Sequence, residues 1–162
     1  MLKPNAIFEK ITDINPEFLH KNKIEGLILD VDNTLIDLDR VELDGIKEWT
    51  DKIKRENIKV CIASNSIKKN KVQKIANKLD IPYIYFSTKP LKRGLKKAVR
   101  ILQIKKENIA EIGDQLFTDV LGANRMKMFS ILTTPISPEK HKLSMIKRKL
   151  ETKILRKYKS EI

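Results

Sequence analysis

The chain alternates between short apolar runs and longer amphipathic stretches. The apolar runs are rich in β-branched residues and predict strands, whereas apolar residues spaced by three and four between them predict helices. Such alternation is typical of an α/β fold in which helices cover a mainly parallel sheet. The sequence therefore predicts a five-stranded sheet, with strands near residues 25–30, 58–63, 83–86, 109–112 and 128–132.

Each stretch between the predicted strands carries one apolar stripe. Because residues three and four apart share a helix face, each stripe predicts a helix that buries that face against the sheet. Trp49 belongs to such a stripe, so we expect it in the core. The stripes are Ile46, Trp49 and Ile53, then Val72, Ile75, Ala76 and Leu79, and then Leu91, Leu95, Ala98, Val99 and Leu102.

Two further helical segments flank this pattern within one expected domain, residues 1–162. Residues 1–23 predict a helical preamble broken by Pro4 and Pro16. Residues 139–162 predict a basic C-terminal helix with nine Lys or Arg and three Glu. This helix either packs on the domain with a solvated basic face or lies on an anionic lipid surface. Its apolar stripe consists of Leu143, Ile146, Leu150 and Ile154.

Composition narrows the function classes. No apolar run reaches the roughly 20 residues of a membrane-spanning helix, and the N-terminus lacks the apolar core of a signal peptide. Cys61 is the only cysteine, so no intrachain disulfide is possible and we expect a cytoplasmic protein. The net charge of +13 favours anionic partners. Nucleic acid is not favoured, because Tyr158 is nearly the only aromatic residue in the basic stretches on which a base could stack.

Polar side chains follow four predicted strands at the point where each strand ends. Asp30 and Asp32 follow the first, in the segment LILDVDNTLI, and Ser64 follows the second. Lys89 comes after the third and Asp114 after the fourth. Each residue alone fits a turn or a helix cap. Together they would meet at the carboxyl edge of a parallel sheet, which is where ligands bind in such folds.

Carboxylates that converge at one edge repel each other unless a cation lies among them, and carboxylate with water suits Mg²⁺. A hydroxyl and a lysine ammonium beside that metal would supply donors for a tetrahedral anion. Phosphoryl transfer depends mainly on such positioning and charge neutralisation. The pattern therefore predicts Mg²⁺-dependent chemistry on a phosphate.

The same residues resemble the four ordered motifs of the haloacid dehalogenase-like (HAD) phosphatase superfamily. The motifs are Asp30-x-Asp32-x-Thr34, Ser64, Lys89 and Gly113-Asp114 followed by Asp119. More narrowly, VDNTL, ASNS, a Lys-Pro pair and GDQ-x-x-TDV-x-GANR resemble subfamily IIIA, in the branch that includes phosphatidylglycerophosphate phosphatases. The resemblance implies a HAD-like, Rossmannoid three-layer fold and phosphatase activity.

The resemblance also implies roles for the acidic residues. Asp30 would attack phosphorus and become an aspartyl-phosphate. Asp32 would protonate the leaving oxygen and later deprotonate the hydrolytic water. Mg²⁺ would be held by Asp30, the backbone carbonyl of Asp32 and Asp114, with Asp119 supporting the metal shell.

The remaining motif residues would bind the phosphoryl group. Ser64 and Lys89 would contact its oxygens, and Lys89 would also lower the repulsion between Asp30 and the incoming phosphate. Thr34 would bind phosphate or only brace the loop, and Asn65 would offer chiefly its backbone.

The spacing of the motifs leaves no room for a large cap domain, because each connection spans about one helix and one strand. An open site suits a phosphate carried by something large: a lipid headgroup, a protein, a nucleic-acid end or a sugar polymer. Phosphatidylglycerophosphate is the leading substrate by resemblance, which would place the protein on the inner face of a membrane. Alternatively, a partner subunit could serve as the lid.

Two other classes remain open at this stage. A signalling receiver domain also combines carboxylates, a hydroxyl and a lysine around Mg²⁺, but there the lysine comes last, whereas here Asp114 follows Lys89. A basic RNA-binding module that retains a phosphatase fold would bind with a steep salt dependence and show no turnover.

Overall fold

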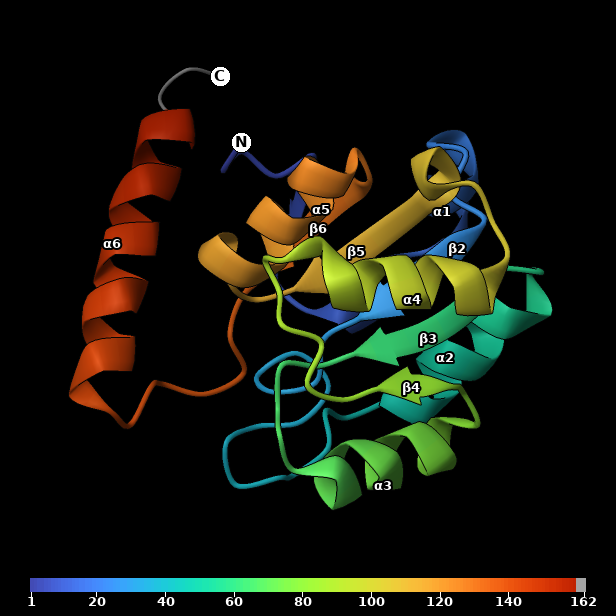
Figure 1. Ribbon diagram of the computed structural model, residues 1–162, viewed down its shortest axis with the longest axis horizontal. Helices are drawn as coiled ribbons and strands as arrows, with labels where there is room; N and C mark the ends of the chain where they lie inside the picture. The colour runs from blue at the N-terminus through green and yellow to red at the C-terminus, as the bar shows by residue number, and fades with distance from the viewer. Residues whose placement is uncertain (160–162) are drawn as a thin grey trace.

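A parallel sheet of six strands forms the centre of the molecule, as Figure 1 shows for the computed structural model, which describes residues 1–159. The strand order is β1-β6-β5-β2-β3-β4, and every neighbouring pair is parallel. The predicted α/β fold with a mainly parallel sheet is thus confirmed, with one strand more than expected. The strands are β1 (Ala6–Phe8), β2 (Gly26–Leu29), β3 (Lys59–Ala63), β4 (Tyr83–Ile84), β5 (Ile109–Gly113) and β6 (Phe129–Thr133).

The extra strand comes from the N-terminal segment, which is helical only in part. Ala6 pairs with Ile131 at the edge of the sheet, so β1 extends the sheet beside β6. A short 3₁₀ helix, η1 (Ile11–Asp13), and the helix α1 (Pro16–Lys21) follow. The prediction of a helical preamble was wrong at β1, because three residues are too few for apolar periodicity to separate strand from helix.

Helices cover both faces of the sheet and make three layers. Along β2, Leu27 and Leu29 point into one apolar core and Ile28 into the other, as the alternation of side chains along a strand requires. In the described chain, single helices join β2 to β3 and β3 to β4, so no cap domain is inserted there. The first core is covered by α1, α2 (Ile46–Arg55) and α3 (Lys69–Leu79), and the second by α4 (Lys92–Leu102) and α5 (Leu121–Met126).

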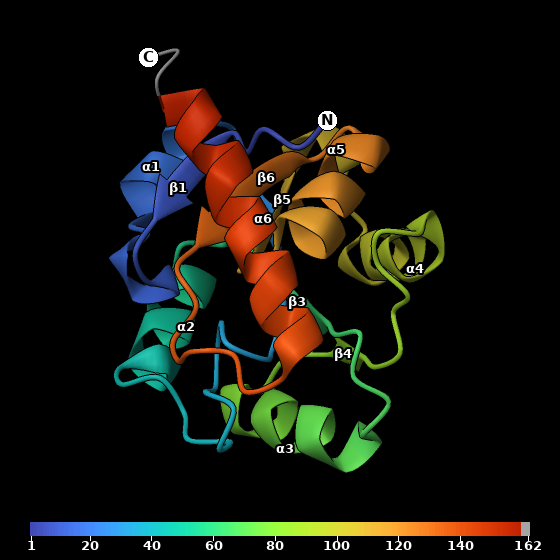
Figure 2. The same cartoon turned by 90° about the vertical axis from the view of Figure 1, so that its left-hand side faces the viewer.

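The last helix, α6 (Lys142–Lys159), lies across the carboxyl ends of the strands (Figures 1 and 2). Its second half packs on the domain, where Ile154 and Leu155 contact a small apolar cluster. Most of the apolar stripe predicted for this segment is instead exposed: Leu143 by 82%, Ile146 by 63% and Leu150 by 50%. Residues 160–162 of the predicted helix lie outside the described residues. None of the described helices combines the length and hydropathy needed to cross a bilayer.

Candidate active site

The carboxyl ends of the two central strands bring the acidic residues together. Asp30 follows β2, and its backbone N–H donates to the carbonyl of Ile112 on β5 at 2.9 Å. Asp114 follows β5 directly, so it lies beside Asp30. A Cβ atom on Gly113 would lie 2.2 Å from Cγ of Asp119, so only glycine leaves room for that carboxylate beside the strand end.

Three buried carboxylates form one cluster. Asp30, Asp114 and Asp119 each offer one oxygen, and these atoms lie within 4.8 Å of one another. Burial raises the pKa of Asp30 well above its usual value, and the neighbouring charge of Asp119 raises it further. Burial, followed by the charge of Asp119, raises the pKa of Asp114 to about 6, although Arg148 opposes the shift. Carboxylates held this close fit a hard divalent cation such as Mg²⁺.

The ammonium group of Lys89 contacts two carboxylates of this cluster. It lies 2.7 Å from Oδ1 of Asp119 and 3.3 Å from Oδ1 of Asp30. Burial alone would lower the pKa of Lys89, but these carboxylates and that of Glu111 outweigh burial and hold the pKa well above its usual value. The side chain is therefore a fixed cation that faces the carboxylate of Asp30.

Glu111 is a third carboxylate at Lys89, and the sequence reasoning missed it. It lies in the middle of β5, is 1% exposed, and places Oε1 3.0 Å from the Lys89 ammonium. Burial raises its pKa to about 8 although Lys89 acts in the opposite direction. The signal was an acidic residue inside the apolar run IAEIG, where a charge is costly without a partner.

Asp32 lies apart from the acidic cluster. Its side chain is 36% exposed and pairs with Lys71 of α3 at 2.7 Å. The carboxylate is thus available to solvent while that of Asp30 is buried. This separation fits a residue that exchanges protons, and Lys71 is a neighbour that the motif did not include.

Asn65 braces Lys89 through its side chain. Oδ1 accepts the backbone N–H of Lys89 at 2.7 Å, and Nδ2 donates to the Lys89 carbonyl at 2.8 Å. Ser64 is 1% exposed, and its Oγ accepts the N–H of Ser66 at 3.1 Å. Thr34 donates its hydroxyl to Oδ1 of Asp114 at 3.2 Å. In this arrangement Asn65 and Thr34 hold other site residues in place.

Helix α6 contributes Arg148 and Glu151 to the site. Nη2 of Arg148 lies 2.6 Å from Oδ2 of Asp114, and Nη1 donates to the Asp114 carbonyl at 2.5 Å. The same guanidinium pairs with Glu139 and Glu151. Glu151 accepts the backbone N–H of Leu116 at 3.0 Å. The helix is therefore fixed to the loop that carries Asp114, a contact that no sequence motif indicated.

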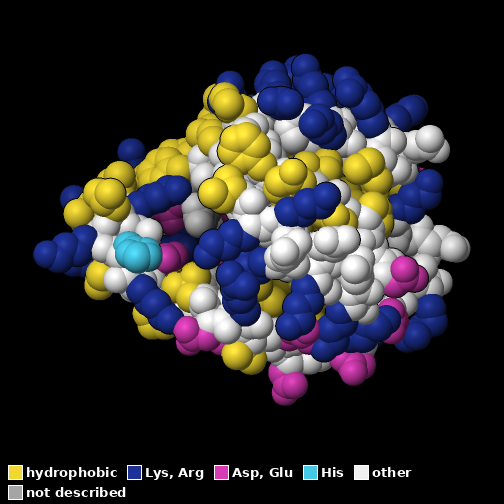
Figure 3. Space-filling view, turned by 60° about the horizontal axis from the view of Figure 1, so that its bottom comes forward, with side chains coloured by type: hydrophobic (Ala, Val, Ile, Leu, Met, Phe, Trp, Pro, Cys, Tyr) yellow, Lys and Arg dark blue, Asp and Glu magenta, His cyan; other side chains and the backbone are white. Residues whose placement is uncertain are grey.

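The site opens to solvent beside α6. Figure 3 shows a hollow in which acidic side chains are visible, bordered by hydrophobic and by Lys or Arg side chains. The expectation of an open site needs correction in one respect, because α6 crosses this edge of the sheet and its Arg148 contacts Asp114. Asp30 is only 7% exposed. The cover comes from the chain itself.

Comparison with known proteins agrees with this geometry. The family model of the haloacid dehalogenase-like hydrolases matches residues 38–127. A protein of Bacillus subtilis (strain 168) named "probable phosphatase YqeG" is 37% identical over 94% of this chain and 88% of its own length. The chain belongs to the haloacid dehalogenase-like hydrolases. It is an enzyme, a phosphatase of the HAD type.

Solved structures show that this phosphatase shares its fold with other proteins. An uncharacterised protein from Listeria monocytogenes serotype 4b aligns with a TM-score of 0.59 at 20% identity, covering 73% of this chain and 85% of its own. A putative HAD family hydrolase from Streptomyces avermitilis MA-4680 aligns with a TM-score of 0.52 at 19% identity. The alignment covers 70% of this chain and 83% of the hydrolase. The phosphatase segment that the family model matches ends before α6, so Arg148 lies outside it.

Proposed function

We propose that the protein hydrolyses phosphomonoesters through an aspartyl-phosphate on Asp30. The observation that carries the proposal is the ion pair between the buried Asp30 carboxylate and the Lys89 ammonium. Asp114 and Asp119 lie beside this pair and could bind a metal ion together with Asp30. A carboxylate oxygen of Asp30 would form a bond to phosphorus as the bond from phosphorus to the ester oxygen breaks. Lys89 and the Ser64 hydroxyl would hold the phosphoryl oxygens.

Asp32 suits the proton transfers in both halves of this reaction. In the first half its carboxylic acid would give a proton to the departing alkoxide. In the second half its carboxylate would take a proton from the water that attacks phosphorus, which releases inorganic phosphate and restores Asp30. Its exposure to solvent and its contact with Lys71 support this role.

Asp30, Asp114 and Asp119 would hold Mg²⁺ together with the backbone carbonyl of Asp32. Burial, and then the repulsion between these neighbouring carboxylates, raises the pKa values of Asp30 and Asp114. When bound, Mg²⁺ neutralises charge on the phosphoryl oxygens and on Asp30.

We propose further that the substrate is presented at a surface, with phosphatidylglycerophosphate the leading candidate. The motif resemblance to subfamily IIIA supports this choice. On a helical wheel, Leu143, Ile146 and Leu150 fall on one flank of α6, and Lys149 and Lys153 fall on the adjoining outer face. Aliphatic side chains next to cations suit the surface of an anionic bilayer better than they suit nucleic acid, which favours stacking aromatics.

Membrane attachment through this flank would place the catalytic edge at the lipid headgroups. Phe86 and Leu91, in the loop between β4 and α4, are 57% and 55% exposed and also follow the carboxyl end of a strand. The first turns of α4 add exposed cations, at Lys92 and Arg93. Each such cation near anionic lipid contributes roughly 1 kcal/mol, so peripheral binding needs only a few.

The test is Mg²⁺-dependent release of phosphate from phosphatidylglycerophosphate in mixed micelles, measured beside the Asp30→Asn variant. The proposal expects turnover by the wild type and none by the variant. Equal rates in both proteins would remove Asp30 as nucleophile. Turnover of other phosphate esters without turnover of the lipid would leave the chemistry in place and overturn the choice of substrate.

A further inference from the structure

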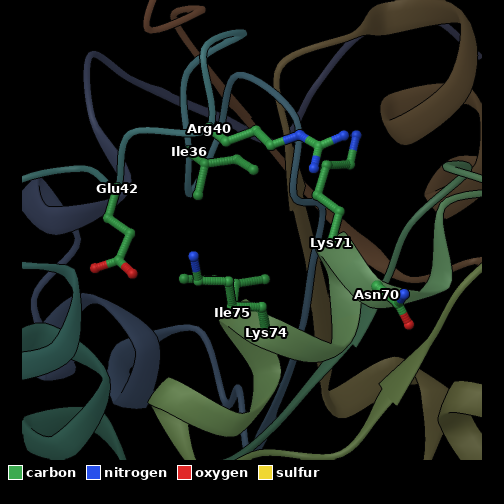
Figure 4. Close-up of a pocket in the computed structure, with 7 residues that line it drawn as sticks. All are labelled: Ile36, Arg40, Glu42, Asn70, Lys71, Lys74 and Ile75. Carbon is green, nitrogen blue, oxygen red and sulfur yellow. The ribbon is translucent and has the colours of Figure 1, made fainter.

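A pocket beside Asp32 combines positive charge with an apolar wall. It lies between the loop that follows β2 and the helix α3, and its volume is about 200 Å³ (Figure 4). Arg40, Lys71 and Lys74 line it, together with the side chains of Ile36 and Ile75. None of these residues belongs to the acidic cluster or to the phosphate-binding motifs.

The cations of this pocket outnumber the acids available to neutralise them. Lys71 is paired with Asp32 at 2.7 Å. Within the described residues, the side chains of Arg40 and Lys74 have no hydrogen bond or ion pair. Glu42, the acid of the pocket, is already bound by Lys78. The pocket therefore carries positive charge that an anion would compensate.

Figure 4 shows where such an anion would lie. The guanidinium of Arg40 and the ammonium of Lys71 end at the same side of the pocket, whereas Glu42 lies at the opposite end. Two cations that end close together repel each other, and an anion between them would offset that repulsion. A guanidinium beside an ammonium is a donor set that suits phosphate oxygens.

The loop that carries Arg40 forms a hydrogen-bonded turn. Oδ1 of Asp37 accepts the backbone N–H of Asp39 at 2.8 Å and that of Val41 at 2.9 Å. The N–H of Arg40 donates to the carbonyl of Asp37 at 3.0 Å. These hydrogen bonds hold the backbone on both sides of Arg40, and they therefore fix the position of its Cα atom.

The pocket is on the leaving-group side of the reaction. In the proposed function, Asp32 protonates the oxygen that departs, and the ion pair between Asp32 and Lys71 joins that position to the pocket. We propose that the pocket binds a second phosphate, carried by the alcohol that leaves, while Ile36 and Ile75 contact the carbon chain between the two phosphates. This inference rests on the proposed function, and it defines the substrate class as phosphomonoesters with a second anionic phosphate nearby.

The experiment compares substrates that carry a second phosphate with substrates that lack it. Glycerol bisphosphate, with a phosphate at each end, is measured beside glycerol phosphate. In a lipid arm, phosphatidylglycerophosphate is measured beside phosphatidic acid. For Arg40→Gln we expect kcat/KM on the doubly phosphorylated substrates to fall about tenfold, chiefly through KM. On the singly phosphorylated substrates kcat/KM should change less than about twofold.

The matched control is Lys69→Gln. Lys69 begins the same helix and is exposed, but it does not line the pocket. The control removes one charge from the overall field, and its kinetics should match those of the wild type on all four substrates. A loss confined to the lipid pair identifies the second phosphate as a lipid phosphodiester, whereas a loss on both pairs identifies any esterified phosphate.

Two results would overturn the inference. One is an equal loss on singly and doubly phosphorylated substrates, because that would reflect a general effect of charge. The other is no preference of the wild type for either doubly phosphorylated substrate while the singly phosphorylated ones are hydrolysed. Absence of hydrolysis of any phosphomonoester by the wild type is a different failure, since it contradicts the proposed function itself.

Discussion

Arg148 binds Asp114 at both ends of the residue, through the carboxylate at 2.6 Å and through the backbone carbonyl at 2.5 Å. The guanidinium also pairs with Glu139 and Glu151, so one cation joins three carboxylates. A helix remote in sequence from the motifs thereby fixes a residue that is proposed to bind metal.

Arg148→Gln should destabilise the protein by about 2 kcal/mol, because it leaves the buried Glu151 and Asp114 without their cation. Urea unfolding in the absence of Mg²⁺ measures this change. Arg156→Gln on the same helix is the control and should have little effect, since Arg156 is exposed. Equal stability of Arg148→Gln and the wild type would show that the contact does not hold α6 in place.

Asp30→Asn should lower the rate of turnover by at least about a thousandfold. The same variant should have a higher melting temperature than the wild type when both are measured without Mg²⁺. Burial and Asp119 raise the pKa of Asp30, so its ionisation opposes folding as the pH rises through that raised pKa. Asparagine removes this cost. Calorimetry at pH 7.5 should show the higher melting temperature for the variant, and the difference should shrink in acid, where Asp30 is protonated in the wild type.

Glu111→Gln should change the pH dependence of stability. Because the pKa of Glu111 is raised from 4.5 to about 8, the contribution of protonated Glu111 to stability is fully present below pH 4.5 and is lost as the pH rises through about 8. Glutamine resembles the protonated form and does not titrate. The variant should therefore gain on the wild type by roughly 3 kcal/mol between pH 5 and pH 8, measured by urea unfolding at both values. A constant difference across this range would contradict the assignment.

Asp32→Asn should slow turnover about a hundredfold or more while leaving Mg²⁺ affinity nearly unchanged. Only the backbone carbonyl of Asp32 is proposed to bind metal, and its side chain faces Lys71. Isothermal titration with Mg²⁺ measures the affinity, with Asp114→Asn as the control that should lose it. A large loss of Mg²⁺ binding in Asp32→Asn would assign its carboxylate to the metal.

The sequence predicted the central strands and their acidic ends because both are local signals. The apolar run before Asp30 predicts a buried strand, and the topology of a parallel sheet then brings Asp114 beside Asp30. The edge strand β1 was missed because three residues carry too little periodicity. The cover over the site was also missed, since the contact of Arg148 with Asp114 joins residues 34 positions apart and has no local pattern.

The sequence also could not predict which side chains of α6 are exposed to solvent. Leu143, Ile146 and Leu150 share a flank at helical spacing, which usually indicates a packed face. The structure instead directs Arg148 and Glu151 toward the sheet, because the polar groups of the 114–117 loop need partners. The apolar flank therefore lies beside the face that packs.

The contact between α6 and the 114–117 loop also bears on the order in which the site matures. Asp30, Lys89 and Asp114 all precede α6 in the chain, so during synthesis they leave the ribosome before Arg148 and Glu151 do. Until α6 has emerged and docked, the loop that carries Asp114 lacks the donors and acceptors that fix it. During synthesis the sheet could thus fold before the Asp114 loop of the active site is fixed in place.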